Sequence, residues 1–164
     1  MINKKITNVY LVGQISNKYE ETFNWRRKIC NEFETYSNIN IINPCNSKHN
    51  YNLFNKENKE KDFFKFKGID LIVSKDRKYV MDSDICICNL NIYDHEQPFI
   101  GSFFELAWFY DCPEKTVIGF SYTNNPNEHP FLRHPFIKQT IDHLVKNVYE
   151  ACELIDLYFN DVER

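Results

Sequence analysis

The chain has 164 residues, of which 43% are hydrophobic and 16% aromatic, so we expect a single domain spanning 1–164 that buries a substantial core without disulfides or metals. Its net charge of -3 provides no basic field for holding a nucleic acid. The N-terminus lacks the apolar core of a secretory signal, and no apolar run approaches the roughly 20 residues of a membrane-spanning helix. These features favour a cytoplasmic protein without membrane association.

The six cysteines lack the spacing of a zinc site or of a disulfide framework. They are scattered through apolar segments without a CxxC pair. Cys86 and Cys88 alternate along a strand-like run, so both point to one face, a spacing that seldom serves zinc. The sequence therefore predicts reduced thiols in the core and no metal site.

Strand-like and helix-like apolar patterns alternate along the chain. We expect strands at 6–12, 39–42, 84–90 and 115–120, and helices at 20 to about 36, 102 to about 111 and 135 to about 159. The nearly continuous apolar run at 84–90 is typical of a central strand covered on both faces. This alternation predicts an α/β fold with a doubly wound parallel sheet.

The stretch 46–67 is rich in asparagine and lysine and contains a cluster of three phenylalanines. It fits either a lid or a solvent-exposed, partly helical segment whose phenylalanines anchor it to the core. Because charge runs usually form solvated faces, we favour the solvent-exposed segment.

In open α/β sheets, ligands bind beyond the carboxyl ends of the strands, where the strand order reverses. The loops 13–16, 89–100 and 121–130 follow predicted strands and should lie there. The chain has only four glycines and contains no GxxxxGK[ST], GxGxxG, GxSxG or HExxH motif. Its sequence therefore gives no support to a nucleoside triphosphatase, a Rossmann dehydrogenase, a serine hydrolase or a zincin.

One carboxylate, Glu105, stands in the almost wholly apolar segment 99–110 at a predicted helix start. Two interpretations remain open. Ser102 and Glu105 match the S-x-x-E capping box, in which the glutamate closes on the serine amide. Alternatively, burial between large apolar neighbours leaves an ionised, poorly hydrated nucleophile near the helix N-terminus.

Four short motifs occur in order over most of the chain. They are VYLVG at 9–13, NP at 43–44, Asp76 leading into SDICICN at 83–89, and GSFFELA at 101–107. Together they resemble the nucleoside 2-deoxyribosyltransferases and the related deoxynucleoside 5'-monophosphate N-glycosidases. The resemblance implies a flavodoxin-like three-layer sandwich and a homo-oligomer whose subunits complete one another's sites. It also implies a deoxynucleoside or deoxynucleotide and a nucleobase as ligands, and no cofactor.

The resemblance also supplies catalytic roles. Glu105 matches the nucleophile, Tyr10 the tyrosine that positions it, and Asp76 the aspartate that handles the departing base. A carboxylate near C1' can trap an oxocarbenium-like state covalently, as in retaining glycosidases. The deoxyribosyl-Glu105 intermediate is then attacked by a second base in a transferase, or by water in a hydrolase. A nucleotide-binding module without turnover is a further alternative, since fold does not fix function.

Substrate contacts are expected from the loops at the carboxyl ends of the strands, at Gly13, Gln14, Ser16, Asn89, Gly101, Ser102, Asn124 and Asn125. Asn124 and Asn125 fit ordinary turn composition equally well. Ser16 with Arg26 or Arg27 is a candidate for contacts with a 5'-phosphate.

Two residues depart from the family pattern. Gln14 replaces a proline, and Phe99 replaces an aspartate for which Asp94 or Glu96 could substitute.

Four other polar residues and one tryptophan are expected to be structural. Asp84, at the start of a buried strand, is more typical of a local hydrogen-bond partner. His129, Arg133 and His134 lie in a loop anchored by prolines, which we favour over a phosphate or subunit contact. Trp25 is expected in the core.

Overall fold

The computed structural model of this chain describes residues 5–16, 18–46, 69–123, 125 and 129–159. Its strands are β1 (Thr7–Gly13), β2 (Ile39–Ile42), β3 (Ile85–Asn89), β4 (Thr116–Phe120) and β5 (His143–Val145). Its helices are α1 (Tyr19–Glu32), α3 (Ile69–Met81), α4 (Ile100–Tyr110), α5 (Pro135–Gln139) and α6 (Val148–Phe159), with a short 3-10 helix η1 at Pro44–Asn46. Apart from residue 46, the stretch 46–67 discussed above lies outside the described residues.

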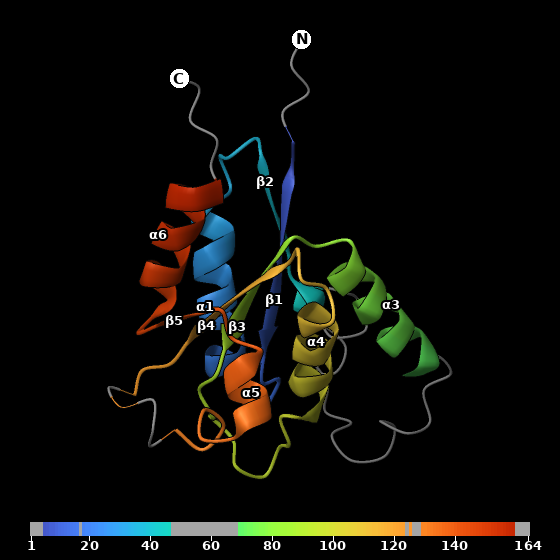
Figure 1. Cartoon of the computed structure of the whole chain (residues 1–164), viewed down its shortest axis with the longest axis vertical. Helices are drawn as coiled ribbons and strands as arrows, with labels where there is room; N and C mark the ends of the chain where they lie inside the picture. The colour runs from blue at the N-terminus through green and yellow to red at the C-terminus, as the bar shows by residue number, and fades with distance from the viewer. Residues whose placement is uncertain (1–4, 17, 47–68, 124, 126–128, 160–164) are drawn as a thin grey trace.

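The five strands form one parallel sheet in the order β2-β1-β3-β4-β5. This is the order of flavodoxin-like folds, and it reverses between β1 and β3. β3 is central and wholly buried, as its continuous apolar run predicts. The predicted doubly wound α/β fold is therefore confirmed (Figure 1).

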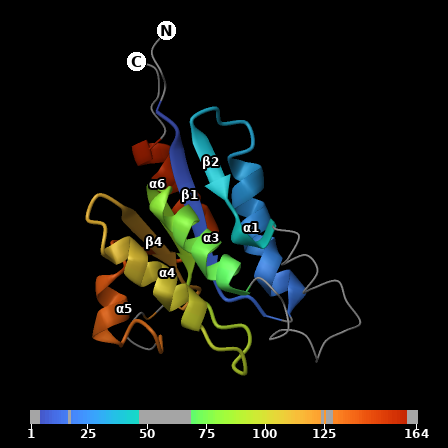
Figure 2. The same ribbon diagram turned by 90° about the vertical axis from the view of Figure 1, so that its right-hand side faces the viewer.

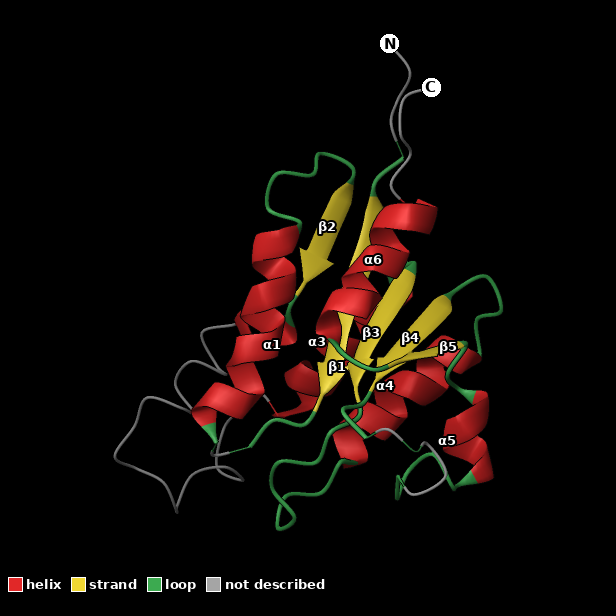
Figure 3. Cartoon of the chain, turned by 90° about the vertical axis from the view of Figure 1, so that its left-hand side faces the viewer, coloured by secondary structure: helices red, strands yellow, loops and turns green. Residues whose placement is uncertain are grey.

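Helices cover both faces of the sheet and give three layers. α1 and α6 pack on one face (Figure 3), and α3 and α4 pack side by side on the other (Figure 2). Because successive strand residues point to opposite faces, Val9 and Leu11 join the α1–α6 core, whereas Tyr10 and Val12 join the α3–α4 core. This alternation places the Tyr10 side chain on the α4 side of the sheet.

The predicted closing helix from 135 to about 159 is wrong. α5 ends where the Thr140 amide and hydroxyl both bond to the Ile137 carbonyl. Asp142 then docks on β4, accepting from the Val117 amide at 2.7 Å and donating its own amide to the Val117 carbonyl. β5 pairs with β4 directly after this contact. The edge strand β5 thus interrupts the segment 135–159, although the apolar residues of this segment have helical spacing.

A cap that is visible in the sequence starts α6 after this strand. Asn147 Oδ1 accepts from the amides of Tyr149 and Glu150, and Glu150 Oε2 accepts from the Lys146 amide. Such reciprocal bonds fix a helix N-terminus. α3 is a second difference, because the strand and helix patterns above left 69–81 unassigned.

The structure contains no disulfide among its six cysteines, and its described part shows neither a membrane-spanning helix nor a metal cluster. All six cysteines are free thiols, and Cys86 and Cys88 share the α3–α4 core as expected. Burial raises the pKa of both thiols. Among the described helices, none combines the length and the apolar character that crossing a membrane requires. The part of the chain that the structure describes contains no cluster of three or more His, Cys, Asp or Glu residues suited to a metal ion.

Candidate functional site

A buried hydrogen bond joins β1 to α4. The Tyr10 hydroxyl donates to Glu105 Oε1 at 2.7 Å, and Tyr10 is fully buried beneath α4. Its ring stacks on Phe109, one turn further along α4, with 6.3 Å between the ring centroids. Burial and the neighbouring Glu105 carboxylate raise the pKa of Tyr10, so the phenol remains a neutral donor. The two residues expected to form the nucleophile pair are therefore in contact.

Glu105 does not cap its helix. α4 begins at Ile100 with Phe99 as its N-cap residue, which makes no side-chain cap bond. The helix starts two residues before the expected Ser102, which turns Glu105 inward toward β1. The capping-box interpretation of Ser102 and Glu105 is therefore wrong.

The surroundings of Glu105 place its titration near neutrality. Burial raises its pKa to about 7, and the Asp76 charge acts in the same direction. The hydrogen bond from Tyr10 and the positive charge of Arg26 oppose this rise. The Glu105 residue as a whole is only partly exposed. A poorly hydrated carboxylate that ionises near pH 7 is suited to nucleophilic catalysis.

Asp76 approaches the pair from α3, which packs against α4. Its side chain is 20% exposed, and burial raises its pKa although Lys75 opposes the shift. Lys75 Nζ lies 3.6 Å from Asp76 Oδ1, and that buried oxygen has no hydrogen-bond partner among the described residues. Asp76 therefore offers a carboxyl group that can hold a proton near Glu105.

Arg26 supplies a buried positive charge near this site. Only 1% of the residue is exposed, and its guanidinium donates to the carbonyls of Gly13, at 2.9 Å, and Thr22. It also lies 4.3 Å from the Trp25 ring centroid. Arg26 therefore holds the end of β1, and its charge lowers the pKa of Glu105. The contact of Arg26 with a 5'-phosphate stays a prediction.

Hydrogen bonds within the turn between β1 and α1 hold this turn together. The Ser16 amide donates to Thr22 Oγ1 at 3.1 Å, and Ser16 Oγ accepts from the Lys18 amide at 3.1 Å. Glu20 and Glu21 lie in the first turn of α1, where their charges oppose an anion. The Ser16 and Lys18 amides are therefore already bonded within this turn and are not open to a phosphate.

Gly13 is required by packing at the end of β1. A Cβ atom at Gly13 would lie 2.9 Å from the Trp25 side chain and 3.1 Å from Asn89 Cβ. Trp25 itself is buried and packs edge-on against Phe120, which confirms it as a core residue. At Gly101, in contrast, an added Cβ would meet nothing within 4 Å, so the first turn of α4 borders open space.

The loop between β3 and α4 is held by buried amide side chains. Gln14 bonds to the backbone of Tyr93, Asp94 and Gln97. Asn89 Nδ2 donates to the Tyr93 hydroxyl at 2.9 Å, and Asn89 Oδ1 accepts from Asn91. Asn91 Oδ1 in turn accepts from the Tyr122 amide at 3.0 Å. The loops after β1, β3 and β4 thus form one connected network at the carboxyl edge of the sheet.

Phe99 is part of an aromatic cluster. Its ring centroid lies 4.9 Å from that of Phe131 and 5.1 Å from that of Phe103. His129 packs on the same cluster, with Nε2 3.0 Å from the Leu90 carbonyl and Nδ1 accepting from the Phe131 amide. Burial lowers the pKa of His129, which favours a neutral, structural imidazole. Phe99 therefore provides packing where the family pattern has a carboxylate.

The remaining expected residues do not join the Tyr10–Glu105 pair. Ser102 is buried in α4, Asn125 is partly exposed, and Asn124 lies outside the described residues. Arg27 is exposed on α1 and bonds to Asn24 and Glu20. Asp84 accepts from the Asn8 amide at 2.9 Å, as expected of a local partner. Asp94 Oδ1 accepts from the Glu96 amide at 3.0 Å, and Glu96 is exposed.

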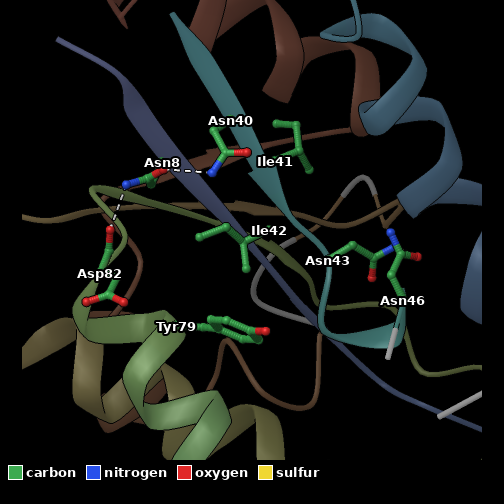
Figure 4. Close-up of a pocket in the computed structure, with 8 residues that line it drawn as sticks. All are labelled: Asn8, Asn40, Ile41, Ile42, Asn43, Asn46, Tyr79 and Asp82. Atoms are coloured by element: carbon green, nitrogen blue, oxygen red, sulfur yellow. Dashed lines mark hydrogen bonds between the residues drawn. The ribbon is translucent and has the colours of Figure 1, made fainter. Parts of the chain in front are cut away.

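A separate hollow opens at the outer edge of the sheet between β2 and α3 (Figure 4). Asn8 crosses it, with Nδ2 donating to the Asp82 carbonyl and Oδ1 accepting from Asn40. It is lined by polar side chains together with two isoleucines and a tyrosine, namely Asn8, Asn40, Ile41, Ile42, Asn43, Asn46, Tyr79 and Asp82. Neither Tyr10 nor Glu105 lines this hollow, so it is separate from the Tyr10–Glu105 pair.

No protein-family profile matches the sequence, and no curated protein matches it. Solved structures do share the fold. A conserved protein from Enterococcus faecalis V583 is 16% identical with a TM-score of 0.60, covering 93% of this chain and 98% of its own. A CMP N-glycosidase from Clostridium botulinum is 13% identical with a TM-score of 0.53, covering 93% of this chain and all (100%) of its own. A 2-desoxiribosyltransferase from Leishmania mexicana is 14% identical with a TM-score of 0.52, covering 76% of this chain and 71% of its own.

Proposed function

We propose that this protein is a nucleoside 2-deoxyribosyltransferase in which Glu105 is the nucleophile. The observation that carries the proposal is the 2.7 Å hydrogen bond from the Tyr10 hydroxyl to Glu105 Oε1, on the α4 side of the sheet. Two proteins that share the fold, a 2-desoxiribosyltransferase and a CMP N-glycosidase, support this class of reaction. The substrates are a 2'-deoxynucleoside and a second nucleobase.

The first step forms a covalent intermediate. An oxygen of ionised Glu105 bonds to C1' of the sugar as the bond from C1' to the base nitrogen breaks. The electron pair of that bond goes to the base, which takes a proton from Asp76. Tyr10 keeps its hydrogen bond to the other carboxyl oxygen and so orients the nucleophile. The products are the free base and a deoxyribosyl ester on Glu105.

The second step reverses the first with another base. A ring nitrogen of the incoming base bonds to C1', and the ester bond to Glu105 breaks to restore the carboxylate. Asp76 takes back the proton that the incoming base loses. Water in place of the base would release free deoxyribose, which is the hydrolase alternative.

The region expected to bind a 5'-phosphate supports a nucleoside rather than a nucleotide. The Ser16 and Lys18 amides are already bonded within the turn, and Arg26 is buried against backbone carbonyls. The two glutamates in the first turn of α1 add negative charge. The deoxynucleoside 5'-monophosphate N-glycosidase therefore remains the second candidate.

The proposal includes a homo-oligomer with shared sites, supported by apolar side chains on the outer face of α4. Ile100 is 58% exposed and Phe104 60%, and both lie near the open space at Gly101. Leu71 and Val73 of the neighbouring α3 are also exposed. Apolar groups gathered on one face are typical of subunit contacts.

Incubation with deoxyinosine and adenine tests the activity directly. The wild-type protein should produce deoxyadenosine, and Glu105→Ala should abolish it. Glu153→Ala, which removes an exposed glutamate of α6, is the matched control and should keep full activity. Undiminished transfer by Glu105→Ala would refute the assignment of the nucleophile.

The covalent intermediate can be trapped with a 2'-fluoro-arabinosyl nucleoside, because the fluorine disfavours the oxocarbenium-like state of the second step. Peptide mass spectrometry should locate the sugar adduct on Glu105. Formation of the adduct itself releases one equivalent of base, so continued release of free base from a deoxynucleoside without an acceptor would instead indicate a hydrolase. Tight nucleoside binding without release of base would indicate a binding module.

A further inference from the structure

The Gln14 side chain bridges two loops at the carboxyl edge of the sheet. Its Nε2 donates to the carbonyls of Asp94, at 2.6 Å, and Gln97, at 2.8 Å. Its Oε1 accepts from the amides of Tyr93, at 2.9 Å, and Asp94, at 3.0 Å. Only 3% of the residue is exposed. Both donors and both acceptor positions of the carboxamide are therefore used on the backbone of one loop.

The place of this bridge gives it a role in ligand binding. Gln14 directly follows β1, and the loop it holds joins β3 to α4. The strand order reverses between β1 and β3, so these two segments form the walls of the crevice in which open α/β sheets bind ligands. Gln14 thus ties one wall of the crevice to the other and fixes their separation.

Further bonds converge on the same loop. Lys18 Nζ donates to the Tyr93 carbonyl, and Asn89 Nδ2 donates to the Tyr93 hydroxyl. Tyr93 is therefore held through its amide, its carbonyl and its side chain. Gln14 is the only one of these partners among the described residues that reaches beyond Tyr93 to the Asp94 peptide groups and to Gln97.

We propose that Gln14 is a positioning residue that holds the 93–97 backbone as a preformed wall of the ligand site. A wall that is already ordered lowers the entropic cost of binding, so its loss should weaken substrate binding more than it slows the chemical step. Gln14 has no bond to Tyr10 or Glu105, and the nucleophile pair should remain intact without it. The identity of the ligand as a deoxynucleoside rests on the proposed function.

Amide hydrogen exchange tests the positioning role without a substrate. In Gln14→Ala the amides of Tyr93 and Asp94 lose their acceptor and should exchange about tenfold faster, as expected for the net loss of one or two hydrogen bonds. Gln97→Ala is the matched control, because it removes an exposed carboxamide from the same loop and leaves the Gln97 carbonyl in place. Unchanged exchange of both amides in Gln14→Ala would overturn the proposal.

Steady-state kinetics test the consequence for the ligand. Gln14→Ala should raise KM for the deoxynucleoside about tenfold and change kcat less than about threefold, the pattern of lost ground-state binding. Gln14→Glu keeps the length of the side chain but removes both donors, and it should also raise KM. Faster exchange with an unchanged KM in both variants would overturn the role in ligand binding. A wild-type protein without turnover would refute the proposed function, and amide exchange would still decide whether Gln14 holds the loop.

Discussion

Replacing Glu105 by glutamine should stabilise the fold in a pH-dependent manner. Burial raises the pKa of Glu105 from an ordinary 4.5 to about 7, so the folded state binds this proton more tightly than the unfolded state. The resulting contribution to stability is fully present below pH 4.5 and is lost as the pH rises through about 7. Multiplying the difference between about 7 and 4.5 by about 1.4 kcal/mol per pH unit gives about 3 kcal/mol.

Glutamine keeps an oxygen that can accept from Tyr10 but does not ionise. Glu105→Gln should therefore match the wild-type stability near pH 4, and near pH 8 it should be more stable by up to about 3 kcal/mol. Urea unfolding across this pH range measures the difference. Glu153→Gln, at an exposed position on α6, serves as the control and should show no comparable gain. A stability difference for Glu105→Gln that does not change with pH would refute the reasoning.

Three further predictions concern the pair and its surroundings. Tyr10→Phe removes the hydrogen bond that lowers the pKa of Glu105, so the acid limb of the pH–rate profile, expected near pH 7, should move upward and kcat/KM should fall by about 10–100-fold. Asp76→Asn removes the proton that the departing base takes in the first step, so substrates with poor leaving bases should lose the most rate. A downward shift of the limb in Tyr10→Phe, or an equal loss of rate for all bases in Asp76→Asn, would contradict the respective assignment. Phe104→Glu places a charge at a 60% exposed position of α4 and should dissociate the proposed oligomer without unfolding the chain. Sedimentation would then report a lower molecular mass than for the wild type. An unchanged molecular mass would show that α4 does not form the subunit contact.

The central part of the fold could be predicted because its patterns are local. Four strand segments are continuous apolar or β-branched runs, and each of them forms a strand within a residue or two of the expected bounds. The central place of β3 followed from its uninterrupted burial. The alternation along β1 fixed which residues share a face, so the position of Tyr10 could be inferred once α4 was assigned.

The last part of the fold depends on a distant partner that the local pattern does not reveal. The apolar residues from 135 to 159 have helical spacing, but the Asp142 carboxylate bonds to the Val117 amide on β4. Pairing with β4 then outweighs the local helical preference over the three residues of β5. The Asn147 cap of α6 is the one sequence signal that marks where the helix resumes.

The side-chain partners in the site were the least predictable feature. Gln14 was expected to contact the ligand because it follows a strand, but its four bonds go to a loop about 80 residues later in the chain. A buried carboxamide can bond to any backbone within reach, and composition does not specify which. Arg26 is a similar case, since its charge reaches Glu105 although its hydrogen bonds hold Gly13 and Thr22.

The choice between cap and nucleophile at Glu105 depends on where α4 starts. A helix beginning after Ser102 would place Glu105 at the third helical position, where its side chain could bond back to the Ser102 amide. With the start at Ile100, Ser102 lies within the first helical turn instead of at the N-cap, and Glu105 lies at the sixth helical position instead of the third, so the capping box does not form. The carboxyl group bonds instead to the buried Tyr10 hydroxyl, and this contact avoids the cost of leaving either buried group unpaired. A shift of two residues in a helix boundary thus converts a solvent-facing cap into an inward carboxylate that ionises near pH 7.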